Sequence, residues 1–197
     1  MKKEHLDWLR ENEACDQSII WVEENNVQSL QEAWTSCERG DWLLWLAAEL
    51  NVDKRKLAMC GALCAHTVIQ YMKDPRSRDA VRIVFLWGRG KATDEQLMAA
   101  RDAARSVVYV TYEDTYWVIA RATRSTRAAV TAQAAARAAD DAFSAIRTAT
   151  RTARTVESVA ETWSDAKAAV KENQLRTAEI ARKVLTEEVM DAIRAIR

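Results

Sequence analysis

The amino-acid sequence predicts an all-α multi-helix bundle, with short helices in its N-terminal part and long Ala-rich helices in its C-terminal part. The 197 residues include four Gly and one Pro, and neither occurs after Gly90. Apolar residues recur at intervals of three and four, as they do on one face of a helix. N-cap signals precede these stretches. We expect one helical domain over 1–197, with a Trp-rich half at 1–90 and an Ala/Arg-rich half at 91–197.

The N-terminal part is expected to begin with three short helices. They are centred on tryptophans that recur at intervals of 13 residues: Trp8, Trp21 and Trp34. Asp16 is expected to cap the second helix, because a short acidic side chain satisfies free backbone amides. Ser29 and Glu32 have the spacing of a capping box for the third helix.

Two further helices are predicted before residue 73. Gly40 is expected to end the third helix and Asp41 to cap the fourth. The segment Trp42–Leu46 is apolar almost all round, so the fourth helix should be deeply buried. Asp53 is expected to cap a fifth helix that continues to about Met72.

Pro75 is expected to open the next helix, and Gly88-Arg89-Gly90 to end it. Its apolar face is formed by Ala80, Val81, Val84, Phe85 and Trp87. Thr93 and Gln96 then form a second capping-box start. From there the pattern is helical to the end of the chain.

One segment of this helical part has an alternative. Val107–Tyr112 and Thr115–Ile119 are rich in β-branched and aromatic residues, so a β-hairpin is conceivable. A helix is favoured because the apolar residues do not alternate. A single helix of about 80 residues would also be about 120 Å long, so breaks are expected. The candidate breaks, where short polar side chains compete for backbone hydrogen bonds, are Thr123–Thr126, Thr148–Thr155 and Asn173.

A seam of small residues with heptad spacing follows. Its positions step by three and four: Ala132, Ala135, Ala139, Ala142, Ile146, Ala149, Ala153, Val156, Ala160 and Trp163. This spacing indicates a partner helix at a shallow crossing angle, and small side chains allow a close approach. The partner is expected to be 94–120 or 174–196 of the same chain, in preference to a second copy.

The charges are unevenly distributed, although the net charge is zero. Residues 1–53 carry 4 Lys/Arg against 12 Asp/Glu, which leaves a surplus of eight positive charges in the remainder. This asymmetry indicates either pairing between the two parts or a surface for a charged partner.

An arginine-rich strip is the main candidate binding surface. No Lys occurs from 92 to 166. A guanidinium forms bidentate hydrogen bonds to phosphate or carboxylate, so the strip suits a nucleotide, a nucleic-acid backbone or an acidic protein. The alternative is a solvated helix face. The candidate binding residues are Arg121, Arg124, Arg127, Arg137, Arg147, Arg151, Arg154, Tyr109, Tyr112 and Tyr116.

Other chemistry has little support. Cys60 and Cys64 share a helix face, with His66 near them in sequence, but we interpret both thiols as small buried core residues and expect no metal site. The sequence contains no catalytic Ser/His/Asp set, phosphate loop or metalloprotease motif, so we expect no enzyme and no cofactor. It shows no export signal or membrane span, which favours the cytoplasm.

One motif resembles a known family. Its residues, Trp34, Cys37, Arg39, Gly40, Asp41, Trp42 and Trp45, are similar to the hallmark of an immunity-protein family of phage genomes and bacterial toxin loci. The resemblance covers about residues 10–150. It implies a function only through genomic association and carries over no binding residues. The motif itself is expected to form core, and the tail differs from the family in its interleaved Arg and Thr.

These observations favour a phage or bacterial protein that inhibits a toxin or an immune-defence component by stoichiometric binding, through its Arg-bearing face or its acidic N-terminal face. The first alternative is a protein that sequesters a nucleotide or nucleic acid with an Arg/Tyr face. The second is a structural helical oligomer, in which a homodimer forms through the Ala seam.

Overall fold

The protein is an all-α multi-helix bundle. The computed structural model describes residues 1, 3–115, 131, 134–135, 143–157 and 163–196, and these contain helices and no strand. The helices are α1 (Lys3–Glu11), α2 (Asp16–Glu24), α3 (Leu30–Ser36), α4 (Gly40–Glu49), α5 (Lys54–His66), the 3₁₀ helix η1 (Ile69–Tyr71), α6 (Pro75–Gly88), α7 (Asp94–Thr115), α9 (Phe143–Glu157) and α10 (Trp163–Ala195).

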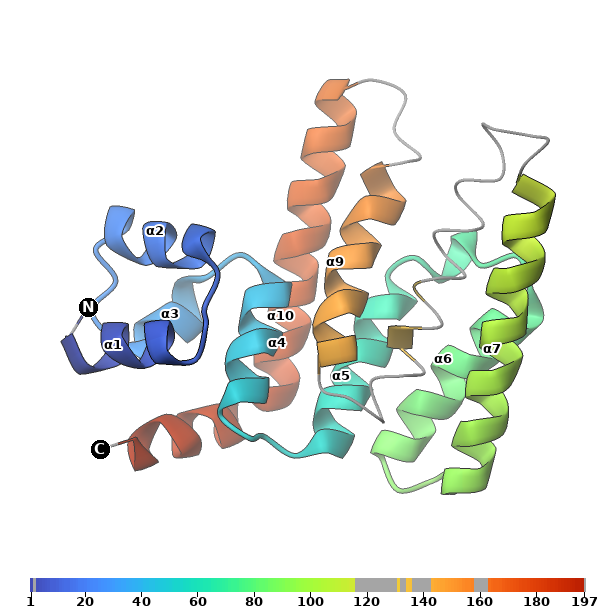
Figure 1. The fold of residues 1–197 in the computed structure, drawn as a ribbon, viewed down its shortest axis with the longest axis horizontal. Helices are drawn as coiled ribbons and strands as arrows, with labels where there is room; N and C mark the ends of the chain where they lie inside the picture. The colour runs from blue at the N-terminus through green and yellow to red at the C-terminus, as the bar shows by residue number, and fades with distance from the viewer. Residues whose placement is uncertain (2, 116–130, 132–133, 136–142, 158–162, 197) are drawn as a thin grey trace.

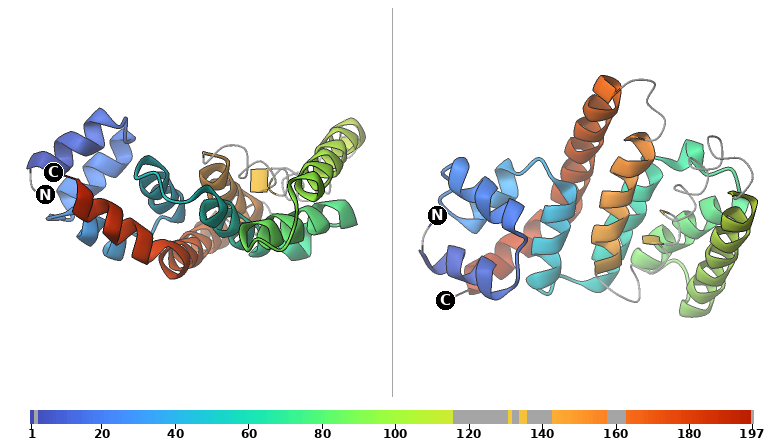
Figure 2. Two further views of the ribbon diagram at one scale, coloured as in Figure 1. Left: turned by 90° about the horizontal axis from the view of Figure 1, so that it is seen from below. Right: turned by 45° about the horizontal axis from the view of Figure 1, so that its top comes forward.

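The molecule is elongated, and its helices are distributed along the long axis (Figure 1). The short helices α1, α2 and α3 form one end, α6 and α7 form the other, and α4, α5, α9 and α10 lie between them. Both chain termini lie at the end formed by α1–α3, and the additional views in Figure 2 show the same order. No helix among the described residues is long and apolar enough to cross a membrane.

The two predicted halves of the chain are interleaved in space. α9 packs against α10 of its own half and against α4 and α5 of the N-terminal half. α10 in turn contacts α3, α4 and α5. The central layer therefore forms only when segments from the two halves of the chain, far apart in the sequence, come together.

Two predicted capping boxes are present. Ser29 Oγ accepts a hydrogen bond from Glu32 N (3.1 Å), although the Glu32 carboxylate accepts from the amide of the residue before Ser29 and not from Ser29 itself. Thr93 and Gln96 cap each other: Gln96 N donates to Thr93 Oγ1 (3.3 Å) and Thr93 N donates to Gln96 Oε1 (2.9 Å). Both caps depend on residues three apart, which is why the sequence reveals them.

Three predictions for helix ends are wrong. The N-cap of α2 is Cys15, without a side-chain cap, and Asp16 is the first helical residue. Gly40 does not end α3, which stops at Ser36, but is the first residue of α4. Asp41 does not cap α4, whose N-cap is Arg39, because its carboxylate pairs with the Arg39 side chain.

α5 starts as predicted but ends earlier. Asp53 accepts a hydrogen bond from Lys56 N (2.9 Å) and is the N-cap. The helix was expected to reach about Met72, yet it ends at His66, and η1 follows after a turn. The C-cap residue Thr67 is buried, and its hydroxyl donates to a carbonyl of the last turn. A buried threonine thus closes the helix without Gly or Pro.

α6 follows its prediction at both ends. It begins at Pro75, with Asp74 as N-cap, and ends at Gly88. Gly90 has a φ of +68°, a conformation in which a residue without Cβ is favoured.

Two of the expected helix breaks are absent. Thr148–Thr155 lies within α9 and Asn173 lies within α10. Thr148 and Thr155 of α9 satisfy their hydroxyls by donating to carbonyls four residues earlier, so they remain compatible with the helix. The predicted break at Thr123–Thr126 lies outside the described residues. A helix is confirmed for Val107–Thr115, and the rest of the hairpin alternative also lies outside them.

The Ala seam has a partner within the chain. Ala135, Ala149 and Ala153 are buried, and Val156 is half-buried. α9, which carries most of these positions, packs against α10, as predicted, and also against α4 and α5. The remaining side chains of the seam lie outside the described part: Ala132, Ala139, Ala142, Ile146, Ala160 and Trp163.

Candidate functional site

The Trp34–Trp45 motif lies along α10. Trp34 is fully buried, and its Nε1 donates to Thr186 Oγ1 (3.0 Å). Arg182, one turn earlier on α10, donates from its guanidinium to Cys37 O (2.8 Å). Later residues of the motif contact earlier residues of α10, so the two segments run antiparallel. The motif therefore anchors the N-terminal helices to the last helix of the protein.

Gly40 at the start of α4 packs directly against Thr177 of α10. A Cβ atom at Gly40 would overlap Thr177 Oγ1 and would lie 2.6 Å from the carbonyl carbon of Thr177. Real Cβ atoms essentially never approach so closely. The motif thus requires Gly40 for packing between helices, not for ending a helix.

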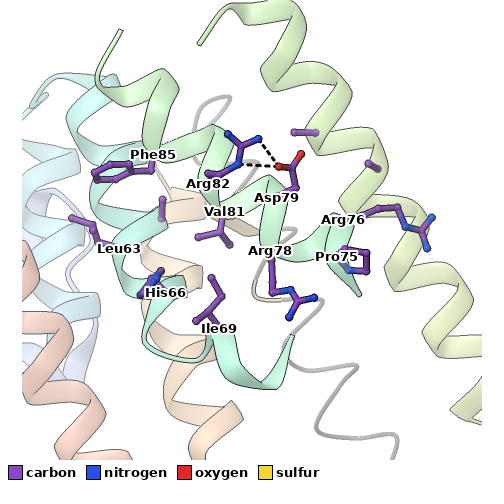
Figure 3. A pocket seen from close by; sticks show the side chains of 13 residues that line it. Leu63, His66, Ile69, Pro75, Arg76, Arg78, Asp79, Val81, Arg82 and Phe85 are labelled. Carbon is purple, nitrogen blue, oxygen red and sulfur yellow. Dashed lines mark hydrogen bonds and ion pairs between the residues drawn. The ribbon is translucent and has the colours of Figure 1, made fainter. Parts of the chain in front are cut away.

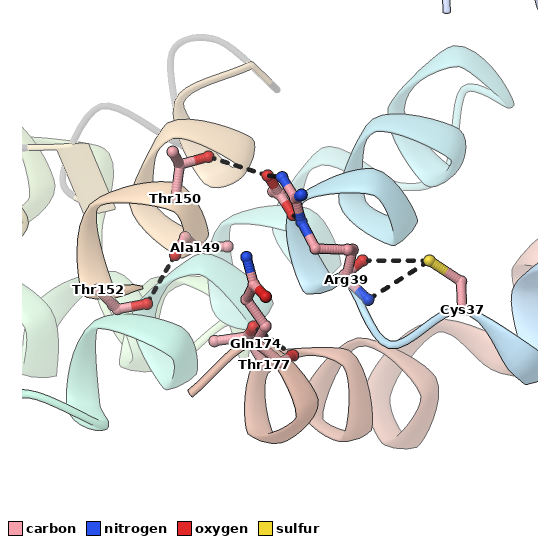
Figure 4. Close-up of polar contacts among 8 residues, drawn as sticks. Cys37, Arg39, Ala149, Thr150, Thr152, Gln174 and Thr177 are labelled. Carbon is pink, nitrogen blue, oxygen red and sulfur yellow. Dashed lines mark hydrogen bonds and ion pairs between the residues drawn. The ribbon is translucent and has the colours of Figure 1, made fainter. Parts of the chain in front are cut away.

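Arg39 and Asp41 form an ion pair beside this contact, and Figure 4 shows Arg39 facing Thr150 of α9. Two guanidinium nitrogens of Arg39 donate to the two carboxylate oxygens of Asp41 at 2.9 and 2.7 Å. Thr150 Oγ1 of α9 donates to Asp41 Oδ2 at 3.4 Å. This pair therefore connects the start of α4 to α9. The hydrogen bonds with Asp41 raise the pKa of Arg39 above its ordinary value, so the side chain remains charged.

The tryptophans join the N-terminal helices to α4. Trp42 packs edge to face against Trp21 of α2, with ring centroids 6.1 Å apart, and Trp45 packs in the same way against Trp8 of α1 at 6.3 Å. The Arg39 guanidinium lies over the Trp42 ring, 4.5 Å from its centroid. The motif is confirmed as a packing element.

A small cavity of about 470 Å³ adjoins the motif. Arg39, Trp42 and Trp21 line one side of it, and Lys167 and Lys171 of α10 line the other. Glu38 and Glu157 also line it. Carboxylates are therefore present beside the two lysines, and Arg39 is already paired with Asp41, so the cavity has little excess positive charge for an anion.

A chain of buried polar side chains connects α5, α9 and α10. Thr152 Oγ1 donates to Asn173 Oδ1 (2.7 Å), and Asn173 Nδ2 donates to Thr67 Oγ1 (3.0 Å). All three residues are buried. Buried polar groups without partners are costly, so these hydrogen bonds fix the relative register of the three helices.

Three of the four cysteines are buried: Cys37, Cys60 and Cys64. Cys60 and Cys64 are fully buried in the core, as predicted, while His66 is exposed. Burial raises the pKa of the Cys37 thiol to about 11, and the hydrogen bond with Cys64 raises that of Cys60. Both thiols therefore stay protonated at neutral pH. Within the described residues, no three His, Cys, Asp or Glu side chains gather as metal ligands.

The structure describes only part of the predicted arginine strip. Arg147, Arg151 and Arg154 lie on one face of α9, where the outer two are exposed and Arg151 is half-buried. Four arginines and one tyrosine lie outside the described residues: Arg121, Arg124, Arg127, Arg137 and Tyr116. Tyr109 and Tyr112 belong to α7, and their side chains lie outside the described part.

A larger pocket than the one beside the motif lies elsewhere, between α5, α6 and α7 (Figure 3). We call it the α6 groove. It has a volume of about 860 Å³ and is an open trough, not an enclosed cavity. Its apolar lining consists of Ala62 and Leu63 of α5, Ile69 of η1, Pro75, Val81 and Phe85 of α6, and Ala100 and Ala103 of α7.

Charged residues of α6 border this groove. Three of them are arginines and one is an aspartate: Arg76, Arg78, Arg82 and Asp79. Asp79 accepts hydrogen bonds from Arg82 at 2.6 and 3.0 Å. Arg76 pairs with the N-cap Asp74 and donates to Ser106 of α7 (2.9 Å), which fixes the orientation of its side chain.

Arg78 differs from its two neighbours. It is exposed and forms no hydrogen bond or ion pair with another described residue. The pKa of Asp74 is lowered mainly by the hydrogen bond from Arg76, and the charge of Arg78 adds to this effect. Figure 3 shows Arg78 near Ile69 and His66 at the border of the groove. The groove therefore combines an apolar floor with a net positive border.

Sequence reasoning missed this groove. Val81 and Phe85 were assigned to the apolar face of their helix, and the three arginines were not among the candidate binding residues. The only signal was the spacing of Arg78 and Arg82, which brings two cations onto one side of α6. The two flanking walls, from α5 and α7, arise only from tertiary packing.

The negative charge of residues 1–53 is concentrated at the opposite end of the molecule. The exposed acidic residues of α1, α2 and the turn between them are Glu4, Glu11, Glu13, Asp16, Glu23 and Glu24. One of them, Glu23, pairs with Arg10 (3.3 Å). The charge asymmetry of the sequence is therefore also an asymmetry in space.

The fold and the groove place this chain in the class of all-α multi-helix proteins with an open apolar surface channel. No protein-family model, curated protein or solved structure matches the chain. The resemblance of its Trp34–Trp45 motif to the immunity-protein family stays a prediction.

Proposed function

We propose that this chain is a binding protein of the bacterial cytoplasm, of phage or bacterial origin, that inhibits a toxin or defence component by stoichiometric contact. The observation that carries this proposal is the α6 groove, which leaves Leu63, Ile69 and Phe85 only half-buried. An exposed apolar surface bordered by charge is typical of a protein-binding site. The resemblance of the motif to immunity proteins supports the same function.

The interior of the protein supports a rigid scaffold. α9 contacts three other helices, and its buried side chains are small or hydrogen-bonded. A rigid scaffold favours binding by occlusion, because little conformational entropy is lost when the complex forms.

The test is affinity capture from a bacterial lysate with the tagged chain, followed by native mass spectrometry. We expect one captured protein in a fixed ratio to the chain, and we expect Arg78→Glu to weaken its capture. Lys54→Glu is the matched control, because Lys54 is an exposed cation at the start of α5, outside the groove. Capture that is equal for both variants, or recovery of a nucleotide alone, would contradict the proposal.

The arginine face of α9 favours a second candidate function, the binding of a nucleotide or nucleic acid. Arg147 and Arg154 are exposed on the same face, with Arg151 between them. A ratio of absorbance at 260 to 280 nm above that of the denatured, desalted protein would reveal a bound nucleotide. The structural oligomer has less support, because Ala149 and Ala153 of its seam are already buried.

A further inference from the structure

We propose that the α6 groove binds an amphipathic α-helix of the partner protein, one whose apolar stripe is bordered by Asp or Glu. This inference rests on the proposed function and adds the chemistry of the partner.

The shape of the groove matches a helix. Four of its lining residues on α6 lie at intervals of three and four and form one stripe: Pro75, Arg78, Val81 and Phe85. Ten residues of helix extend about 15 Å. An incoming helix with anchors at i, i+4 and i+7 needs about 10 Å of such a channel. Three anchor side chains therefore fit along α6, between the ridges of α5 and α7.

The openness of the groove favours a helix over a lipid chain. Small ligands typically bury roughly 70–90% of their surface in a binding pocket. An acyl chain in this open trough would keep one side in water. An amphipathic helix avoids that cost, because its outer face is polar and stays hydrated.

The border of the groove selects the charge of the partner. Three arginines against one aspartate leave two positive charges among the lining residues, and the carboxylate of Asp79 is already bound to Arg82. Arg78 forms no hydrogen bond or ion pair with another described residue, and a carboxylate of the partner can accept two hydrogen bonds from its guanidinium. A basic helix would face repulsion at the same place.

The test uses a displayed library of 18-residue peptides, selected on the full-length protein and depleted on Ala103→Trp. Ala103 is half-buried on α7 and lines the groove, so an indole at this position fills the channel from its wall. Ala99→Trp is the matched control, because Ala99 is exposed on α7 outside the lining.

We expect the selected peptides to carry apolar residues at helical spacing with flanking acidic residues. Their affinity, measured by fluorescence anisotropy, should fall at least about tenfold with Arg78→Glu, a change of about 1.4 kcal/mol. It should stay unchanged with Ala99→Trp and Lys54→Glu. Selected peptides that are basic or lack helical spacing would overturn the inference. So would a failure of Ala103→Trp to exclude any peptide, or binding of dodecanoate or anionic vesicles in place of peptides.

The two proposals can fail separately. If a captured target binds equally well to Ala103→Trp, the groove is not its binding site, while stoichiometric inhibition still holds. If acidic helices bind in the groove but no protein is captured in a fixed ratio, the proposed function is wrong and the helix-binding property remains.

Discussion

Gly40 at the start of α4 lies directly against the backbone of Thr177 in the middle of α10. The carbonyl carbon of Thr177 would be 2.6 Å from a Cβ atom at position 40. This contact lies next to the Arg39–Asp41 pair, and it follows the bonds that Trp34 and Cys37 form with later residues of α10. A residue without a side chain therefore determines how closely the first and last parts of the chain approach.

Replacing Gly40 with Ala should destabilise the protein by about 1–3 kcal/mol, because the added methyl group forces α4 and α10 apart. Urea unfolding followed by circular dichroism measures this change. Thr177→Ala should reduce the cost of Gly40→Ala, since it removes part of the overlap. The control is Gly90→Ala, whose Cβ would meet no atom within 4 Å and whose cost should not depend on Thr177. Equal costs of Gly40→Ala with and without Thr177→Ala would contradict the contact.

The tryptophan pairs should be energetically coupled. In a double-mutant cycle with leucine at Trp8 and Trp45, we expect a coupling energy of about 0.5–1.5 kcal/mol, the value typical of an edge-to-face aromatic pair. Trp8 with Trp42 is the control cycle, because Trp42 pairs with Trp21. A coupling energy no larger than in this control cycle would show that the Trp8–Trp45 pair does not stabilise the packing of α1 against α4.

Thr67→Val and Thr152→Val should each cost about 1–3 kcal/mol, because each leaves a polar group of the buried Asn173 without its partner. In the background of Asn173→Leu, both substitutions should cost much less. Thr148→Val is a suitable control, because the Thr148 hydroxyl is bonded within its own helix. Thermal and urea unfolding provide the measurements. Costs that are the same in both backgrounds would rule out the network.

The stability of the protein should fall between pH 9 and pH 11. Burial raises the pKa of Cys37 from 9.0 to about 11, so the unfolded chain releases the thiol proton at lower pH than the folded chain. The stabilisation is complete below pH 9 and disappears as the pH rises through 11.

Urea unfolding at pH 8, 9, 10 and 11 checks this dependence. Cys37→Ala should reduce the loss of stability, and Cys60, whose pKa is also raised, accounts for part of the remainder. Cys15→Ala is the matched control, because Cys15 is exposed. If Cys37→Ala and the wild type lose stability in parallel, Cys37 does not contribute.

Local signals were predicted well from the sequence. Ser29, Asp53, Thr93 and Pro75 were assigned to helix starts, and each of them is found there. The interactions behind these assignments join residues at most four apart, so the sequence contains all of their participants. The burial of Leu43, Leu44 and the cysteines of α5 was also predictable, because these segments are apolar on nearly all sides.

The residues with wrong assignments have partners that are distant in the sequence. Gly40 was interpreted as a helix end, although its role depends on Thr177. Asn173 was interpreted as a helix break, but its amide is bonded to Thr67 and Thr152. In both cases the residue has a known local tendency, but its partners lie between about 20 and more than 100 positions away in the sequence.

The sequence by itself determined that this protein is built of helices, because caps, breakers and apolar periodicity act over one or two turns. Only the tertiary structure decided which helices meet and where a surface remains open. The α6 groove is the clearest case: Val81 and Phe85 were expected to lie on the apolar face of a helix, yet the spacing of α5, α6 and α7 leaves an open groove there among the described residues. That spacing depends on packing between segments that no local pattern relates.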